Sequence, residues 1–240
     1  MALTFDEGPS TVTAPVLEAL KTANVKATFH VVTPYLFGTN PLKFTLERAY
    51  KDGHLIGLRF PTSKNPLAMS DEGFKNTLRV ESEEIFKAIK QYPRFLRLPS
   101  NQVDERLVKL AEEEGFVVSE WNIDTNDYSP TTTAASIIAQ YQAPFTQAGS
   151  IRPGFISLHH DGESVTAYKD VATLASVIKM IQDNGYQLVT MDTCLGNHKL
   201  GKGKYREKNG NIGSKSNDAM SLSLSSMMTA MTGFLGAMFF

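Results

Sequence analysis

The stretch Thr4-Phe5-Asp6-Glu7-Gly8-Pro9 decides the fold, because it joins a β-forming run to two adjacent carboxylates and a turn. An apolar strand that ends in charge is typical of α/β folds, which place their chemistry at strand ends. Paired carboxylates there can divide the work, one holding a cation or proton while the other stays a free base. The alternative is a plain strand followed by an acidic turn.

Further motifs follow along the chain in a fixed order. They are Lys26-Ala27-Thr28-Phe29, Gly53-His54-Leu55-Ile56-Gly57, Arg97-Leu98-Pro99, residues 121–128, Leu158-His159-His160-Asp161 and residues 185–196. With the opening stretch, they resemble the NodB-type polysaccharide deacetylases, carbohydrate esterase family four, and within that family the fungal chitin deacetylases. Each motif is weak alone, but the ordered set is specific. The resemblance covers residues 1–196 and implies a distorted (β/α) barrel.

Alternating patterns along the chain agree with such a barrel. Short apolar runs bounded by turn residues predict strands at 1–5, 27–32, 54–57, 95–98, 117–121, 155–158 and 187–190. Apolar spacings of three and four predict helices at 14–22, 44–51, 72–91, 104–114, 133–141 and 171–184. Strand alternating with helix predicts a largely parallel sheet in a single α/β domain.

Composition narrows the class of protein. The 240 residues are 42% hydrophobic, enough for one sizeable core, and a net charge of -1 argues against nucleic acid as a partner. Cys194 is the single cysteine, so a disulfide framework or zinc finger is excluded. It is either a buried thiol or one whose partner is missing. The resemblance implies a partner just upstream of the first strand, so we expect a truncated N-terminus.

The resemblance also implies a role for each site residue. Asp6 is the base and His160 the acid, Arg97 positions Asp6, and Asp127 tunes His160. The alternatives are a surface histidine at 160 and solvated charges at 97 and 127. Expected substrate contacts come from Leu158 lining the acetyl pocket, Tyr128 in place of a wall tryptophan, Pro99, and the backbone N–H of Ser100.

The expected metal site departs from the family pattern. The family holds zinc or another divalent ion with an acidic residue and two histidines, and Glu7, Arg59 and Ser63 stand at those positions. A catalytic zinc normally takes three protein ligands, and Arg cannot ligate it. We therefore expect no metal cofactor. His30 and His54 are interpreted as strand residues rather than as substitute ligands.

Arg59 instead offers a fixed positive charge to the two carboxylates. We expect it to pair with Glu7, because unneutralised like charges at a partly buried strand end destabilise the fold. The alternative is that Arg59 points to solvent and Arg97 alone neutralises the pair.

Two functions from different classes follow. One is an N-deacetylase of chitin or a related N-acetylglucosamine polymer in cell-wall carbohydrate metabolism. The other is a catalytically impaired relative, without the metal site, that binds cell-wall carbohydrate. Both imply a polysaccharide partner, and we expect a monomer.

The composition changes after Gly196. Residues 197–225 are polar, rich in Lys, Gly, Asn and Ser, and predict a flexible linker. The apolar tail 226–240 is shorter than the roughly 20 residues that span a bilayer. It fits a glycosylphosphatidylinositol (GPI) attachment signal, the alternative being an amphipathic or disordered end. Such an anchor implies a secreted or cell-surface protein. The chain shows no signal peptide, which the expected truncation would explain.

Overall fold

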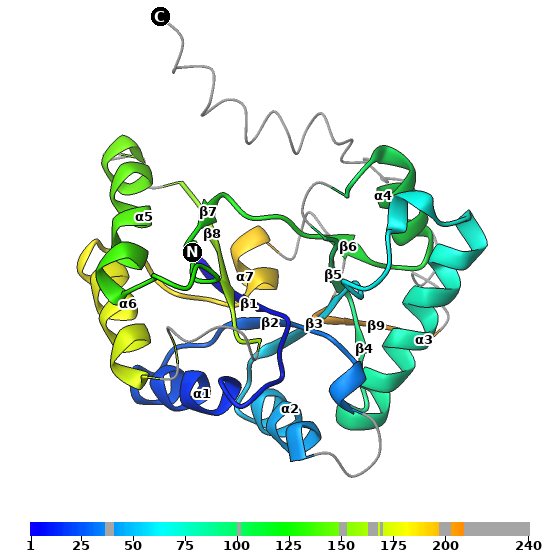
Figure 1. The fold of residues 1–240 in the computed structure, drawn as a ribbon, viewed down its shortest axis with the longest axis horizontal. Helices are drawn as coiled ribbons and strands as arrows, with labels where there is room; N and C mark the ends of the chain where they lie inside the picture. The colour runs from blue at the N-terminus through cyan, green and yellow to red at the C-terminus, as the bar shows by residue number, and fades with distance from the viewer. Residues whose placement is uncertain are drawn as a thin grey trace, which may run out of the picture.

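The computed structural model describes residues 1–36, 41–99, 102–148, 153–162, 168, 170–196 and 203–208, and shows a curled sheet wrapped by helices (Figure 1). Seven of the described strands form one parallel sheet in the order β6-β5-β3-β2-β1-β8-β7. Its strands are β1 (Ala2–Asp6), β2 (Thr28–Val31), β3 (Leu55–Arg59), β5 (Phe95–Arg97), β6 (Val117–Val118), β7 (Ile123–Asp124) and β8 (Ile156–His160). β6 and β7 lie at opposite ends of this order, so the barrel is open between them. The expected distorted (β/α) barrel is confirmed.

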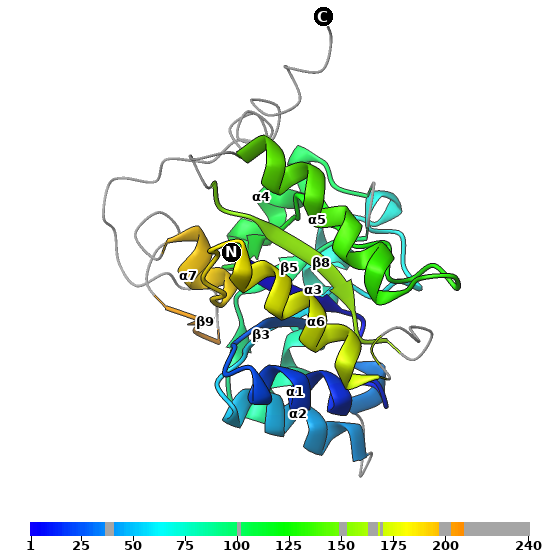
Figure 2. The ribbon, with the colours of Figure 1, turned by 90° about the vertical axis from the view of Figure 1, so that its left-hand side faces the viewer.

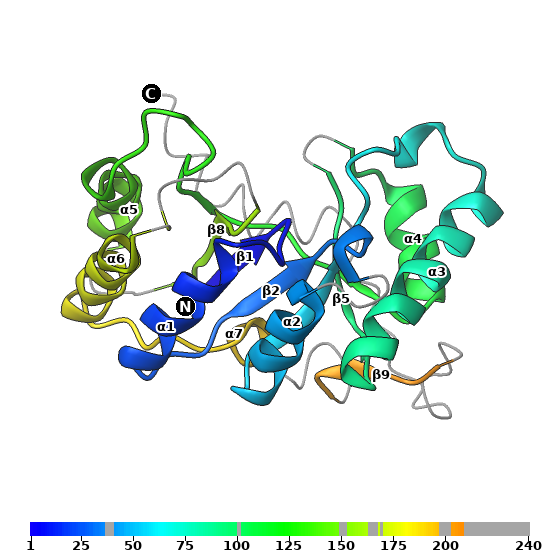
Figure 3. The same ribbon diagram turned by 60° about the horizontal axis from the view of Figure 1, so that its bottom comes forward.

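Helices cover the outside of the sheet. They are α1 (Thr13–Thr22), α2 (Pro41–Lys51), α3 (Asp71–Ile89), α4 (Glu105–Glu113), α5 (Ala134–Ala148) and α6 (Val171–Asp183), with short 3-10 turns η1 (Pro34–Leu36) and η2 (Pro66–Ala68). Around the sheet they follow the order α5, α6, α1, α2, α3, α4, each in contact with the next (Figure 3). A smaller helix, α7 (Met191–Leu195), lies near the N-terminus at the start of β1 (Figure 2).

The alternation of side chains along β1 separates core from site. Phe5 is buried and stacks on Phe29 of β2, with ring centroids 5.2 Å apart, in the core between sheet and helices. Successive strand residues face opposite sides, so Thr4 and Asp6 share the other face. Strands buried on both faces are typical of parallel sheets covered by helices. The carboxylate of Asp6 therefore faces the inside of the barrel.

Three parts of the fold differ from the sequence-based prediction. The predicted strand 187–190 is wrong, because its backbone pairs with the sheet at Met1 alone, through Gln187 and Val189, and Thr190 already caps α7. α5 continues beyond the predicted end through Pro144 to Ala148. β7 and α7 were not predicted, since a two-residue strand and a five-residue helix give almost no periodic signal.

A second small sheet joins distant parts of the chain. β9 (Tyr205–Arg206) pairs antiparallel with β4 (Tyr92–Pro93). Arg206 stacks on the ring of Phe116, with its guanidinium carbon 4.3 Å from the centroid, and donates to the Ser82 hydroxyl at 2.8 Å. β9 lies within the segment 197–225 that we expected to be a linker. Residues 203–208 thus pack on the domain, and the rest of that segment, with the tail 226–240, lies outside the described residues.

Candidate functional site

The parallel register brings four charged strand ends together. Asp6 at the end of β1 is aligned with His30 of β2 on one side and with His160 of β8 on the other. Arg59 at the end of β3 is aligned with Arg97 at the end of β5. Because the carboxyl ends of parallel strands meet at one edge of a sheet, residues far apart in the sequence form one site.

Arg97 holds the carboxylate of Asp6 at the centre of this site. Its Nη1 donates to Asp6 Oδ1 at 2.9 Å and to the Thr4 hydroxyl at 2.7 Å, and its Nε donates to the Ser119 carbonyl at 3.2 Å. The side chain is fully buried, and its guanidinium lies over the Trp121 ring. The alternative of a solvated Arg97 is therefore wrong, and the contact has the geometry that positioning of Asp6 requires.

Arg59 also turns inward, against both carboxylates. Its Nε lies 3.4 Å from Asp6 Oδ2 and its Nη2 lies 3.6 Å from Glu7 Oε1, while Nη1 donates to the Arg97 carbonyl at 3.4 Å. Only 7% of the side chain is exposed, so the solvent-facing alternative is wrong. The contact with Glu7 is an ion pair slightly longer than a hydrogen bond, and Asp6 is the nearer partner.

These charges set the protonation of Asp6. Burial alone would raise the pKa of Asp6, but Arg97, the hydrogen bond to His30 and Arg59 together hold that pKa well below its usual range. A carboxylate with so low a pKa stays charged at any ordinary pH. It is correspondingly a weak proton acceptor.

His160 and Asp127 form a second pair at the mouth of the site. His160 Nδ1 lies 2.8 Å from Asp127 Oδ1, and the His160 backbone N–H donates to Asp127 Oδ2 at 2.6 Å. Burial would lower the pKa of His160, but the Asp127 hydrogen bond and the charges of Asp127, Asp6 and Glu7 raise it. Burial raises the pKa of Asp127 as well. The alternatives of a surface His160 and a solvated Asp127 are wrong, because both side chains are buried.

Of the four residues expected to contact the substrate, three lie within the described part of the chain. Tyr128 is 54% exposed, and its ring meets the His160 ring edge-on at 5.5 Å, so it forms a wall beside the imidazole. Leu158 is buried two residues before His160 in β8, on the same face of the strand. Pro99 is buried after β5, and its carbonyl accepts from the Gln102 N–H. Ser100, the expected backbone donor, lies outside the described residues.

Two residues beside Asp6 and Arg97, the buried His30 and the half-buried Glu120, were not predicted as site residues. His30 Nδ1 lies 3.2 Å from Asp6 Oδ1, and His30 Nε2 lies 3.0 Å from the Ser119 hydroxyl. Burial and Arg97 lower the pKa of His30 to about 4, so it is neutral. Burial also raises the pKa of Glu120, next in the chain after Ser119, to about 7. The register of β1 with β2 aligns His30 with Asp6, and no local pattern in the sequence signals it.

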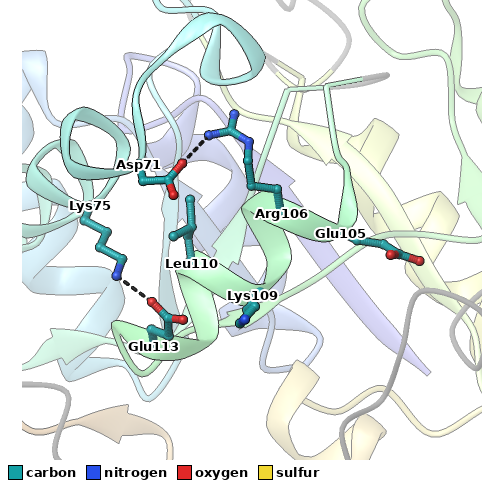
Figure 4. A pocket seen from close by; sticks show the side chains of 7 residues that line it. All are labelled: Asp71, Lys75, Glu105, Arg106, Lys109, Leu110 and Glu113. Atoms are coloured by element: carbon teal, nitrogen blue, oxygen red, sulfur yellow. Dashed lines mark hydrogen bonds and ion pairs between the residues drawn. The ribbon is translucent and has the colours of Figure 1, made fainter.

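A pocket of about 420 Å³ lies elsewhere, between α3 and α4 (Figure 4). Two ion pairs cross it, Arg106 to Asp71 at 2.8 Å and Lys75 to Glu113 at 2.5 Å. Lys109, Glu105 and Leu110 complete the lining. Its three cations and three anions balance, so it has no preference for a charged ligand, and it contains none of the expected site residues.

Comparison with known proteins decides the family. Residues 1–119 match the model of the polysaccharide deacetylase family. The chain is 30% identical over 202 residues to the putative polysaccharide deacetylase YheN of Bacillus subtilis, covering 82% of this chain and 68% of that protein. The chain belongs to the polysaccharide deacetylase family. The chitin deacetylase of the fungal pathogen Colletotrichum lindemuthianum superposes with a TM-score of 0.72 at 26% identity, covering 81% of this chain and 86% of that one.

Other members show the range of the polysaccharide deacetylases. The chain spans 66% of the length of a peptidoglycan-N-acetylglucosamine deacetylase from Bacillus cereus and 40% of PgdA from Listeria monocytogenes. It also shares its fold with BA3943 of Bacillus anthracis, described as a CE4 family pseudoenzyme, with a TM-score of 0.68 at 21% identity over 81% of this chain and 64% of that one. The family thus contains members with and without activity.

The residues of this chain do not fit the divalent ion of the polysaccharide deacetylases. Glu7 can offer a carboxylate oxygen, but the guanidinium of Arg59 has only N–H donors and lies against both carboxylates. Ser63, at the second histidine position, is exposed in the turn after β3. Across the described ranges, no group of three or more His, Cys, Asp or Glu side chains is arranged to hold a metal ion.

Proposed function

We propose that this polysaccharide deacetylase family member binds N-acetylated cell-wall polysaccharide without metal-dependent hydrolysis. The observation that carries the proposal is the position of Arg59, which contacts Asp6 and Glu7 from the place of a metal ligand. An amide hydrolase needs an activated water and a group that stabilises the oxyanion. Here the ligand set for the ion is missing, and Asp6, the expected base, is a weak proton acceptor.

An exposed aromatic ring beside the site supports the same proposal. Tyr128 stands exposed beside His160, and an aromatic face next to polar groups suits a sugar ring. The polymer we propose is chitin or a related N-acetylglucosamine polysaccharide, because relatives are named as chitin and peptidoglycan-N-acetylglucosamine deacetylases. We propose a monomer that acts outside the cell, held at the surface by a GPI anchor. No helix among the described residues is long and apolar enough to cross a membrane.

A second candidate is a deacetylase that works without a metal. The observation in its favour is the His160–Asp127 pair, which keeps a buried imidazole of raised pKa within the site. Such an imidazolium could protonate a leaving amine. This candidate ranks second because hydrolysis requires a proton acceptor that activates water. Asp6, the expected base, has a low proton affinity.

One pair of measurements separates the two candidates. Sedimentation of the protein with insoluble chitin and with peptidoglycan measures binding, and acetate release from N-acetylglucosamine oligomers measures hydrolysis, with and without added zinc, cobalt or nickel. The binding proposal expects sedimentation with at least one polymer and no acetate above the level of an Asp6→Asn, His160→Ala variant. Acetate release that this double substitution abolishes would establish the enzyme instead.

A further inference from the structure

The guanidinium of Arg59 has more donors than partners. It carries five N–H donors, yet among the described residues it makes one hydrogen bond, at 3.4 Å, to the carbonyl of Arg97. Its Nε is buried without a hydrogen-bond partner, and the side chain is 7% exposed. Buried donors are nearly always satisfied, so each exception requires an explanation. Nε faces the buried carboxylate of Asp6, 3.4 Å away, so the donors that a ligand can meet are the terminal N–H groups, of which Nη2 lies 3.6 Å from the partly exposed Glu7 without a hydrogen bond to it.

Glu7 places an acceptor beside those donors. Its side chain is 35% exposed, whereas the carboxylate of Asp6 behind it is buried. The backbone of Glu7 has a φ of 73°, a conformation that costs a non-glycine residue about 1 kcal/mol or more. The stem of Glu7 also packs closely on Gly162, where an added Cβ would lie 3.3 Å from the Glu7 Cβ. The backbone thus fixes this carboxylate at the mouth, next to Arg59.

A donor beside an acceptor suits a neutral group that both accepts and donates, and the secondary amide is the group of this kind that distinguishes an N-acetylated sugar from its deacetylated form. Its carbonyl oxygen accepts hydrogen bonds and its N–H donates one, and the group has no net charge. The Arg59–Glu7 pair is likewise neutral as a unit. From this we infer that Arg59 and Glu7 together bind the acetamido group of an N-acetylated sugar, with Arg59 donating to the carbonyl oxygen and Glu7 accepting from the N–H.

The inference makes Arg59 the residue that selects the acetylated sugar. It rests on the proposed function, since it names the group of the polysaccharide that this site recognises. A deacetylated sugar presents an ammonium, which meets the fixed positive charge of Arg59. Without that charge, Asp6 and Glu7 would leave an acidic site that prefers the ammonium. Arg59 therefore decides whether the site prefers the acetylated or the deacetylated sugar.

Calorimetric titration with the N-acetylglucosamine tetramer and with the glucosamine tetramer tests this selectivity. The wild type is expected to bind the acetylated tetramer at least about tenfold more tightly, the value of one charge-assisted hydrogen bond. Arg59→Met is expected to reverse the preference. Arg106→Met, which removes a half-buried arginine of α4 outside the site, is the matched control and should keep it.

Arg59→Met leaves two carboxylates without the Arg59 guanidinium. If that variant fails to fold, a second variant tests the inference. Glu7→Gln combined with Arg59→Met removes one of those charges and is expected to bind both tetramers with affinities within about threefold of each other. A wild-type preference that survives in both variants would overturn the inference and leave the proposed function standing. Failure of the wild type to bind either tetramer or either polymer would overturn the proposed function itself.

Discussion

Arg59 lies 3.4 Å from the carboxylate of Asp6 and 3.6 Å from that of Glu7, so one guanidinium bridges the two acids that open the chain's decisive motif. In a metal-dependent member the ion would supply the positive charge at this place. The bridge is asymmetric, because Asp6 is buried and Glu7 is partly exposed. Five predictions test what this charge, its neighbours and the rest of the domain contribute.

Purified protein is expected to hold no stoichiometric zinc, cobalt or nickel, because Glu7 is the one good ligand among the three positions. Combining Glu7→Asp, Arg59→His and Ser63→His should create micromolar or tighter zinc affinity, measured by calorimetry and elemental analysis. The control is Glu7→Asp with Ser63→His, which retains Arg59 and should bind no better than the wild type. About one tightly held ion per wild-type chain would contradict the prediction.

Replacing Arg59 with Ala should lower the free energy of unfolding, measured by urea denaturation, because it removes the cation from two carboxylates. Its coupling to Glu7 should be about 0.2–1 kcal/mol, since that pair is long and partly exposed. The double-mutant cycle with Glu7→Gln measures this coupling directly. The rest of the free energy that Arg59→Ala loses reflects the contact of Arg59 with Asp6. A coupling of zero would show that Glu7 is no partner of Arg59.

Loss of Arg97 should be far more damaging. Arg97→Met leaves the buried carboxylate of Asp6 without its 2.9 Å partner, and breaking such a pair typically costs about 3–5 kcal/mol. Lys179→Met, at an exposed ion pair with Asp183, should cost about 1 kcal/mol or less in the same urea measurement. Similar costs for the two variants would refute a central role for the buried pair.

Glu120 and Asp161 should each contribute less stability as pH rises from about 4 to about 7. Burial raises the pKa of Glu120 to about 7 and that of Asp161 to about 7, so both carboxyls are protonated in the folded state at pH values where the unfolded chain has lost the protons. The stability they contribute is full below the unfolded pKa and is lost as pH approaches the folded value.

Glu120→Gln should remove the share of Glu120 in this loss and make the slope of stability against pH more positive, since the amide cannot ionise. Three buried histidines oppose the trend of the carboxyls, because burial lowers the pKa of His30 and His54 to about 4 and that of His159 to about 3, and the folded chain gains stability as the pH rises above these values. Asp6 contributes no slope in this window, because its pKa is lowered below it. Urea denaturation at pH 4.5, 6 and 7.5 measures the slope, with exposed Glu105→Gln as the control. A Glu120→Gln protein with the wild-type slope would show that this carboxyl is ionised in the folded state.

Removal of the chain after Gly196 should destabilise the domain, because it deletes β9 and the Arg206 contacts with Phe116 and Ser82. Arg206→Ala in the full chain should cost about 1–3 kcal/mol, from a hydrogen bond and a desolvated cation–π contact. Lys208→Ala, with an exposed side chain, is the control. Thermal denaturation checks the order wild type, Arg206→Ala, truncated chain.

Local pattern in the sequence predicted the sheet and the helices where an element was long enough to show it. α3 and α6 were found within two residues at each end, because their apolar residues repeat at helical spacing. β4 and β9 could not be found, since two residues carry no period. Their pairing also joins segments that lie far apart in the sequence. The same limit hid α7.

The site was predictable to the extent that it lies in motifs. Asp6, Arg97 and His160 stand at strand ends, and the structure brings them together. The contact of His30 with Asp6 depends on the register of β1 and β2, which no local pattern fixes. That Arg59 lies nearer to Asp6 than to Glu7 depends on side-chain packing, which the sequence alone does not specify.

The arginine at position 59 also restricts how this chain could change by mutation. A single Arg59→His step, in the direction of a metal site, removes the cation before an ion can bind well, because Ser63 still stands at the second histidine position. The intermediate would carry two adjacent carboxylates with Arg97 as their remaining guanidinium. Substitutions at positions 59 and 63 are therefore expected to be epistatic, since Arg59→His should destabilise a chain that still has Ser63.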